Sequence, residues 1–292
     1  MLLAVLAGCA QRSVEDVQSN YVGSSVPRWT GSVSRAGSGR ALAEGMWSFF
    51  WPSGRLQAQG DFRGGALPGP ADELSDRTQV PGEGRWGRWR EWNAAGVLVA
   101  EGSYAAGRRV GFWRTWSDAG LRSSEGAWID GREDGPHLAW HANGALAREE
   151  FFRGGERDGR LRCWDEHGTL RAESSWVAGV QQGPSSAWDE RGVLRERAEY
   201  RAGLLDGRRE LWNARGETSC VSSYAAGVLE GPEELYHPDG RLRLRGQYSR
   251  GVPSGTWSAW DENGRELWSR EEPATRAPEL DMPAPSATPG GS

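Results

Sequence analysis

The residues best suited to metal binding or acid–base chemistry are four histidines and a few neighbouring carboxylates. His137 and His141 have an even spacing, which on a β-strand places both side chains on one face. No cysteine and no third histidine accompanies them in this stretch, so we expect no metal site. Glu149 and Glu150 could suggest a hydrolase, but adjacent strand residues point to opposite faces. We therefore predict no catalytic residues, no cofactor and no enzyme activity.

A second polar pattern belongs to a repeat in which glycine recurs every 24 residues. Residues 69–86 interrupt this spacing after the first copy. The glycines that open the copies, taken as position 0, are Gly45, Gly87, Gly111, Gly135, Gly159, Gly183, Gly207, Gly231 and Gly255. Position 6 is polar from Asn93 onward, and such a column could bind cations or could cap turns. We favour turn capping, because Asn, Asp and Ser readily bond to neighbouring backbone groups.

Aromatic residues form two further columns. Position 5 is aromatic in all nine copies and position 17 is aromatic in the eight complete copies. These side chains could pack across neighbouring strands, or could form an exposed row that binds a ligand. Whether the two columns share a face depends on the strand register, which stays open. The candidate ligand-binding residues are Trp92, Trp116, Trp140, Trp164, Trp188, Trp212 and Trp260.

Each copy has the pattern of a β-hairpin. Turn formers such as Asn143-Gly144 occupy positions 8 and 9, and they supply the positive φ angles of tight turns. Apolar or small residues at positions 11, 13, 15 and 17 alternate with more polar ones, which indicates a strand with one packed face. Glycine is too frequent for helices of three turns. The predicted fold class is all-β, with tandem 24-residue β-hairpin repeats that form an elongated antiparallel meander.

The composition fits a repeat protein that is mostly surface. The 292 residues include 42 Gly and 17 Trp, and the mean hydropathy is −0.68. Disordered chains are poor in aromatic residues, so this polarity favours a sheet that buries little area per residue. The net charge is −5, and the 35 basic residues are all arginines without a basic block. Nucleic acid is therefore not an expected partner.

The N-terminus suggests an attached lipid. The sequence Leu6-Ala7-Gly8-Cys9 resembles the bacterial lipobox, in which the cysteine becomes the lipidated first residue of a lipoprotein. The apolar residues before it would be the end of a signal peptide, whose missing charged start implies a start codon farther upstream. Acyl chains on Cys9 would serve as a membrane anchor. The resemblance favours the outer membrane, because no Asp follows Cys9.

The copies resemble MORN-type repeats, in particular the bacterial variant G-x-W-x-x-W-x-x-x-G-x-L. Gly87, Trp89, Trp92, Gly96 and Leu98 match this pattern, and the resemblance covers residues 45–268. It implies a MORN-like repeat sheet that acts as a scaffold, a dimerisation module or a membrane-associated platform. The variant is common among YwqK-family antitoxins, and this resemblance implies a cytosolic protein that binds a partner toxin.

These observations divide the chain into six segments. They are residues 1–9, a signal-peptide remnant with the lipobox; 10–44, a flexible tether; 45–68, the first repeat; 69–86, an insertion; 87–270, the hairpin array; and 271–292, a disordered tail. The expected function is that of a non-enzymatic envelope lipoprotein whose array binds a protein partner or a cell-envelope glycan. The alternative is a cytoplasmic antitoxin-like regulator. An exposed edge strand could also pair with a second copy.

Overall fold

The computed structural model describes residues 14–35, 40–68 and 80–272. Within these residues the protein is all-β: 21 strands form one open antiparallel meander, and there is no helix. It follows that this part of the chain has no helix long and apolar enough to cross a membrane. The predicted fold class of tandem hairpins is confirmed. The chain divides into two compact units, residues 1–168 and 169–292, which are described separately.

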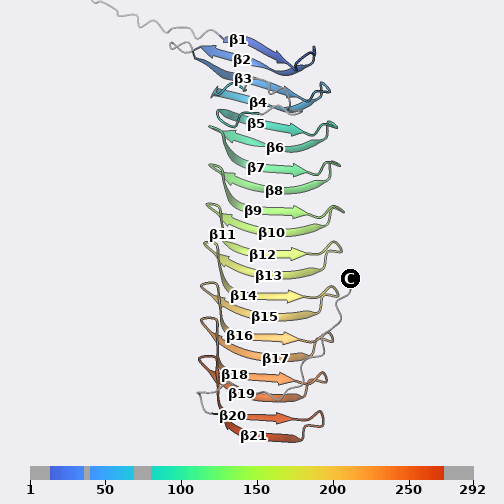
Figure 1. Ribbon diagram of the computed structural model, residues 1–292, viewed down its shortest axis with the longest axis vertical. Helices are drawn as coiled ribbons and strands as arrows, with labels where there is room; N and C mark the ends of the chain where they lie inside the picture. Colours follow the sequence, from blue (N-terminus) through green and yellow to red (C-terminus); the bar gives the residue numbers. More distant parts are fainter. Residues whose placement is uncertain (1–13, 36–39, 69–79, 273–292) are drawn as a thin grey trace, which may run out of the picture. The chain divides into compact units, whose positions relative to one another are not determined.

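Unit 1 contains the first twelve strands (Figure 1). They are β1 (Val14–Asn20), β2 (Pro27–Arg35), β3 (Ala41–Phe50), β4 (Leu56–Gly65), β5 (Arg85–Trp92), β6 (Leu98–Ala105), β7 (Arg108–Trp116), β8 (Arg122–Ile129), β9 (Arg132–Trp140), β10 (Leu146–Arg153), β11 (Glu156–Arg157) and β12 (Gly159–Trp164). Each strand from β1 to β10 pairs antiparallel with the next, and β10 pairs with both β11 and β12.

Unit 2 repeats the same arrangement with nine strands. They are β13 (Leu170–Val177), β14 (Val180–Trp188), β15 (Leu194–Arg201), β16 (Leu204–Trp212), β17 (Thr218–Ala225), β18 (Val228–Tyr236), β19 (Leu242–Ser249), β20 (Val252–Trp260) and β21 (Glu266–Glu272). Each strand from β13 to β20 pairs antiparallel with its successor.

The flexible tether expected over residues 10–44 is wrong for most of that segment. β1 and β2 form a hairpin there, and β3 begins at Ala41, before the glycine that opens the first copy. This hairpin lacks the glycine spacing of the later copies, so the repeat pattern could not reveal it. Residues 1–13, which include the predicted lipidation site Cys9, lie outside the described residues.

The predicted insertion and tail differ slightly from the strand boundaries. β5 begins at Arg85, inside the expected insertion 69–86, and residues 69–79 lie outside the described part. β21 ends at Glu272, two positions into the expected tail 271–292, and residues 273–292 are not described.

Two turns close each hairpin copy. At positions 6–10, the Asn93 side-chain oxygen accepts hydrogen bonds from the amides of Ala95 (3.1 Å) and Val97 (2.9 Å). Asp189, Asn213 and Asp261 make the same pair of bonds in unit 2. These bonds confirm turn capping for the position-6 residues that make them.

The return turn between copies needs a left-handed backbone at two successive residues. Ala106 has a φ of 49° and Gly107 a φ of 78°. A turn with two successive positive φ angles matches the right-handed twist of the flanking strands. Glycine at the second residue has no Cβ atom, so only the first residue has the steric cost of a positive φ. The glycine of position 20 therefore has the role that the repeat predicts for it.

The stacking face carries positions 2, 15 and 17, as in Trp89, Gly102 and Tyr104. Trp89 lies opposite Gly102, and the Tyr104 ring packs edge-on against Trp89 with a centroid distance of 6.2 Å. The next ladder shifts between Glu101 and Ser103, opposite Gly111 within β7. This bulge lets each position-2 ring lie across the backbone of the preceding strand.

The charged face carries positions 3, 5, 11 and 14. Tyr236 at position 5 donates a hydrogen bond of 2.6 Å to Glu234 at position 3, so these two positions share a face. The ladder also shifts between Glu91 and Trp92, and Leu98 at position 11 comes to lie opposite Trp92. The expected alternation 11, 13, 15, 17 is therefore wrong at position 11, because the bulge moves it to the charged face.

The core lies on the stacking face. In unit 1, Trp47, Phe49, Phe62 and Trp89 are at most 1% exposed and form one cluster. In unit 2 the corresponding cluster is smaller and is built around Trp257. A single sheet thus obtains buried aromatic rings by laying them over glycine rather than by packing against a second layer.

Candidate functional site

The position-5 column predicted as the ligand-binding row lies on the charged face in both units. All seven predicted tryptophans are half-buried, so they are neither core residues nor a bare apolar surface. Positions 5 and 17 lie on opposite faces, which answers the question that the sequence left open. Arginine side chains lie over some of these rings, with Arg122 4.9 Å from the Trp140 centroid and Arg197 6.0 Å from that of Trp212.

A ladder of opposite charges borders this column in unit 1. Glu101 lies 2.7 Å from Arg88 and 3.5 Å from Arg90, and Arg114 of the next hairpin is 3.6 Å away. The hydrogen bond from Arg88 and the charges of the three guanidinium groups lower the pKa of Glu101 despite its partial burial. The charged face therefore presents partly exposed aromatic rings beside fixed donors and acceptors.

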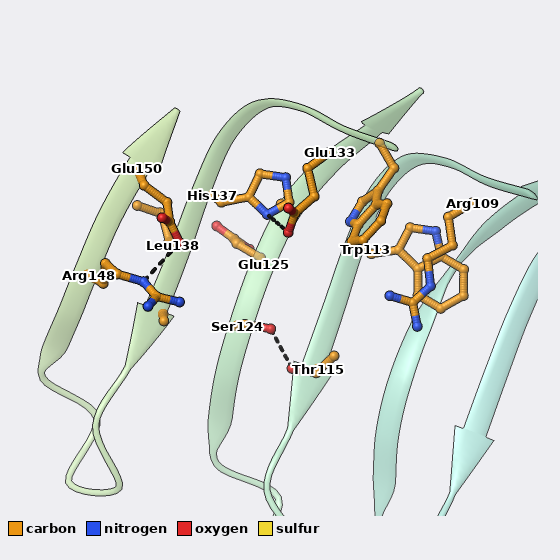
Figure 2. Close-up of a pocket in the computed structure, with 13 residues that line it drawn as sticks. Arg109, Trp113, Thr115, Ser124, Glu125, Glu133, His137, Leu138, Arg148 and Glu150 are labelled. Carbon is orange, nitrogen blue, oxygen red and sulfur yellow. Dashed lines mark hydrogen bonds and ion pairs between the residues drawn. The ribbon is translucent and has the colours of Figure 1, made fainter. Parts of the chain in front are cut away.

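A pocket opens on the stacking face of unit 1, between β7 and β10 (Figure 2). Its volume is about 160 Å³, enough for several water molecules at about 30 Å³ each. Arg109 and Trp113 lie at one end of the pocket and Glu150 at the other, as Figure 2 shows. Its further polar lining includes Thr115, Ser124, Glu133, His137 and Arg148.

His137 creates room in the pocket because it takes the place of tryptophan at position 2. In the preceding copies the indole Nε1 of Trp89 and Trp113 donates to the carbonyl of the residue at position 16, at 3.2 and 3.0 Å. His137 Nε2 makes the same contact with the Ala127 carbonyl at 2.8 Å. Because a carbonyl only accepts, this nitrogen carries the proton. The imidazole thus keeps the bond of an indole but fills less space.

The other ring nitrogen of His137 faces a carboxylate. Nδ1 lies 3.6 Å from Oε1 of Glu133, and the imidazole packs edge-on against Trp128 and Phe152. Glu133 is one-third exposed, so it can reach the pocket and the solvent.

Glu150 closes the far end of the pocket as a buried ion-pair partner. It occupies position 15, where the earlier copies have glycine, and it is 4% exposed. Arg148 and Arg157 each place Nε 2.9 Å from one of its oxygens. A buried carboxylate needs such partners to offset its lost hydration. Its charge is thus balanced within the protein.

Unit 2 carries a polar network on its stacking face in place of tryptophan. Arg209 at position 2 donates from Nε to Glu196 at 2.7 Å. Glu233, at the same position of the next copy, is hydrogen-bonded by the Tyr248 hydroxyl, and burial raises the pKa of this carboxyl group. Burial together with the nearby Glu233 raises the pKa of Tyr248 to about 12. Cys220 lies in the same network as a free, half-buried thiol.

The remaining histidines and carboxylates of the sequence analysis do not converge. His141 Nε2 contacts the Trp164 carbonyl at 2.8 Å, whereas His137 contacts Ala127. Glu149 pairs with Arg162 on the charged face, opposite the stacking face that holds Glu150. Within the residues that the structure describes, no three His, Cys, Asp or Glu side chains are grouped so as to hold a metal ion.

Sequence reasoning missed the position-2 pocket because it ranked columns by how constant they were. Position 2 changes from Trp113 to His137 as position 15 changes from Gly126 to Glu150 in the strands around it. This paired change in an otherwise regular repeat was the sequence signal that could have indicated the pocket.

The sequence matches no protein-family model and no curated protein. The MORN-type resemblance is thus a prediction that rests on the glycine and aromatic pattern alone.

Proposed function

We propose that the protein is a non-enzymatic binding scaffold of the bacterial envelope, whose position-5 column binds an extended partner, best a cell-envelope glycan. The observation that carries this proposal is the partial exposure of the seven tryptophans on one face of the hairpins. Core indoles would be closed to solvent, as Trp89 is. An aromatic ring beside fixed charged groups is suited to a ligand with apolar C–H faces and hydroxyl edges.

The periodicity of the column favours a glycan over a protein partner. Each hairpin advances the sheet by two strands, about 10 Å at about 4.8 Å per strand. Indoles recur within each unit at this interval, and an extended β-linked polysaccharide presents the same sugar face again after each disaccharide, a similar distance. The Arg–Glu ladder beside the column adds donors and acceptors for hydroxyl groups. A protein partner would need its own matching repeat.

The binding test uses the full chain and purified cell-wall glycan in a co-sedimentation assay. We expect Trp116→Ala combined with Trp140→Ala to lower the bound fraction at least fivefold. The matched control replaces Ile129 and Leu204 by Ala, two exposed apolar residues at strand ends, 62% and 49% exposed. Equal binding by both double variants, with circular dichroism showing intact sheet, would exclude the aromatic column.

Anchoring is tested separately, by fractionation of cells that express the chain with its native upstream sequence. We expect the parent in the membrane fraction and a Cys9→Ala variant in the soluble fraction. If both proteins are soluble in the cytosol, the anchor is excluded and the antitoxin-like alternative gains support.

A further inference from the structure

Two neighbouring copies place an arginine in the same aromatic stack. Arg85 lies over the rings of Trp89 and Tyr104, with centroid distances of 4.5 and 5.1 Å. Arg109, at the same position of the next copy, lies over Trp113 and Trp128 at 4.4 and 5.0 Å. Each guanidinium group thus lies over an equivalent pair of aromatic rings, and the hydrogen-bond partners of the two groups can be compared directly.

Arg85 is satisfied within the protein. Its NH1 group donates to the Glu91 carboxylate and to the Tyr104 hydroxyl, both at 3.1 Å. Its Nε and NH2 groups donate to the carbonyls of Pro81 and Val80, and the residue is only 8% exposed. A buried guanidinium with five N–H donors requires such partners.

Arg109 lacks the counterparts of these partners. Thr115 stands where Glu91 is, and Trp128 stands where Tyr104 is, so the carboxylate and the hydroxyl are both missing. Among the described residues no side chain or carbonyl accepts a hydrogen bond from this guanidinium, and it lines the pocket of about 160 Å³ instead. The carboxylates that line the pocket already have partners: Glu150 and Glu125 are each paired with two arginines, and Glu133 lies beside His137.

We infer that the pocket binds a small hydroxylated carboxylic acid, such as a sugar acid, whose carboxylate takes the place beside Arg109 that Glu91 fills beside Arg85. Charge-assisted bonds from arginine to a carboxylate are short and strong, and they favour a planar carboxylate. The rest of the lining offers the Thr115 and Ser124 hydroxyls and the Glu133 carboxylate. These groups suit ligand hydroxyls rather than an apolar body.

The charge of the pocket argues against a doubly charged ligand. Two arginines, Arg109 and Arg148, and three carboxylates, Glu125, Glu133 and Glu150, line the pocket. Glu125 and Glu150 are each paired with two arginines. A dianion such as phosphate would therefore bring a second negative charge beside carboxylates, with no further unused guanidinium to offset it. A single carboxylate needs only the one unused guanidinium. The inference concerns the stacking face and does not depend on the proposed role of the charged face.

The test is calorimetric titration of the full chain with glucuronate, glucose and inorganic phosphate. Glucuronate and glucose share a ring and differ in one carboxylate, so they isolate the contribution of Arg109. We expect glucuronate to bind at least tenfold more tightly than glucose or phosphate. Equal affinity for glucose, tighter binding of phosphate, or no binding of glucuronate would each overturn the inference.

Two variants test the site from opposite directions. Arg109→Gln removes the guanidinium, and Thr115→Glu supplies the carboxylate that Glu91 provides in the neighbouring copy. We expect each to weaken glucuronate binding at least tenfold, while Thr115→Glu also raises the melting temperature because Arg109 gains its partner. Arg153→Gln, an exposed arginine at a strand end (79%), is the control and should bind like the parent. Unchanged glucuronate binding by Thr115→Glu, which keeps the aromatic stack intact, would overturn the assignment even if Arg109→Gln fails to fold.

Glucuronate binding could also be lost in variants of the position-5 tryptophans but kept in Arg109→Gln and Thr115→Glu. That result would place the binding surface on the charged face and would overturn the inference.

Discussion

The hairpins of the two units share one 24-residue spacing but fill their stacking faces differently. In unit 1, Trp47, Trp89 and Trp113 lie over glycines of the preceding strand and are at most 3% exposed. In unit 2, the same position holds Ser185, Arg209 and Glu233 before tryptophan returns as Trp257 in the last, incomplete copy. The turns and the pairing are alike in both units, so this contrast isolates what the aromatic stack contributes.

The contrast shows that positions 2 and 15 behave as one packing unit. A Cβ atom at Gly60 or Gly102 would overlap the indole of the following copy. Where position 2 is not aromatic, position 15 is free to hold a side chain, as in Ala198 before Arg209. The pocket at His137 lies where the copies change from an aromatic ring over glycine to polar side chains at positions 2 and 15. The imidazole of His137 still covers Gly126, but position 15 of the next strand pair is already Glu150.

The largest effect is expected from removal of a stacked indole. Trp89 is fully buried between Phe62, Phe49 and Tyr104. Trp89→Ala should lower the free energy of unfolding by about 3–5 kcal/mol, as for other buried aromatic residues. Ser185→Ala at the same position of unit 2 should change it by less than about 1 kcal/mol. Chemical denaturation monitored by circular dichroism measures both. Similar losses would mean that the stack does not distinguish the units.

A smaller effect is expected from adding a methyl group under an indole. Gly102→Ala should cost about 1–3 kcal/mol, because the Trp113 ring has to move off the strand. The matched change in unit 2 is Ala198→Gly, which creates no clash and should cost about 1 kcal/mol or less. Near-ultraviolet circular dichroism would report the displaced indole. An unchanged spectrum and an unchanged stability for Gly102→Ala would contradict the claim that the residues at positions 2 and 15 pack as a pair.

The fold was predictable because it depends on local, repeated signals. Gly and Asn-Gly at fixed positions specify the turns, and the alternation between them specifies strands, so the hairpin follows from the spacing alone. The position-5 tryptophans were found for the same reason. The hairpin of β1 and β2 was missed because Val14–Asn20 and Pro27–Arg35 carry no copy of the repeat.

The pocket could not be predicted because it depends on register. The bulge opposite Gly111 decides that Trp113 crosses Gly102, and a shift of one residue would turn every side chain to the other face. Without that register, Arg85 and Arg109 are two arginines among 35 basic residues. Only their shared place in the stack shows that one has a carboxylate partner and the other does not.

An ion pair of unit 2 should matter less than a stacked ring of unit 1. Arg209 is bonded to Glu196 at 2.7 Å, and the two side chains are 28% and 35% exposed. Pairs at this level of exposure contribute about 1 kcal/mol or less. Arg209→Met should therefore lower the free energy of unfolding by about 1 kcal/mol, and the loss should shrink in high salt. Arg245→Met, whose side chain is 59% exposed, is the control. A loss as large as that of Trp89→Ala would show that the network stabilises unit 2 as strongly as the stack stabilises unit 1.

The smallest effect should appear only as a change with pH. Burial raises the pKa of Glu233 above 4.5, the value in an unfolded chain. Between these two pKa values the folded protein binds more protons than the unfolded chain, so stability falls as the pH rises through this window and is level above it. Glu233→Gln keeps an acceptor for the Tyr248 hydroxyl but cannot ionise. The variant and the parent should have similar melting temperatures below pH 4.5, and the variant should become the more stable one towards neutral pH. A parent that gained stability relative to the variant as the pH rose would mean that the carboxylate is stabilised by its neighbours rather than penalised by burial.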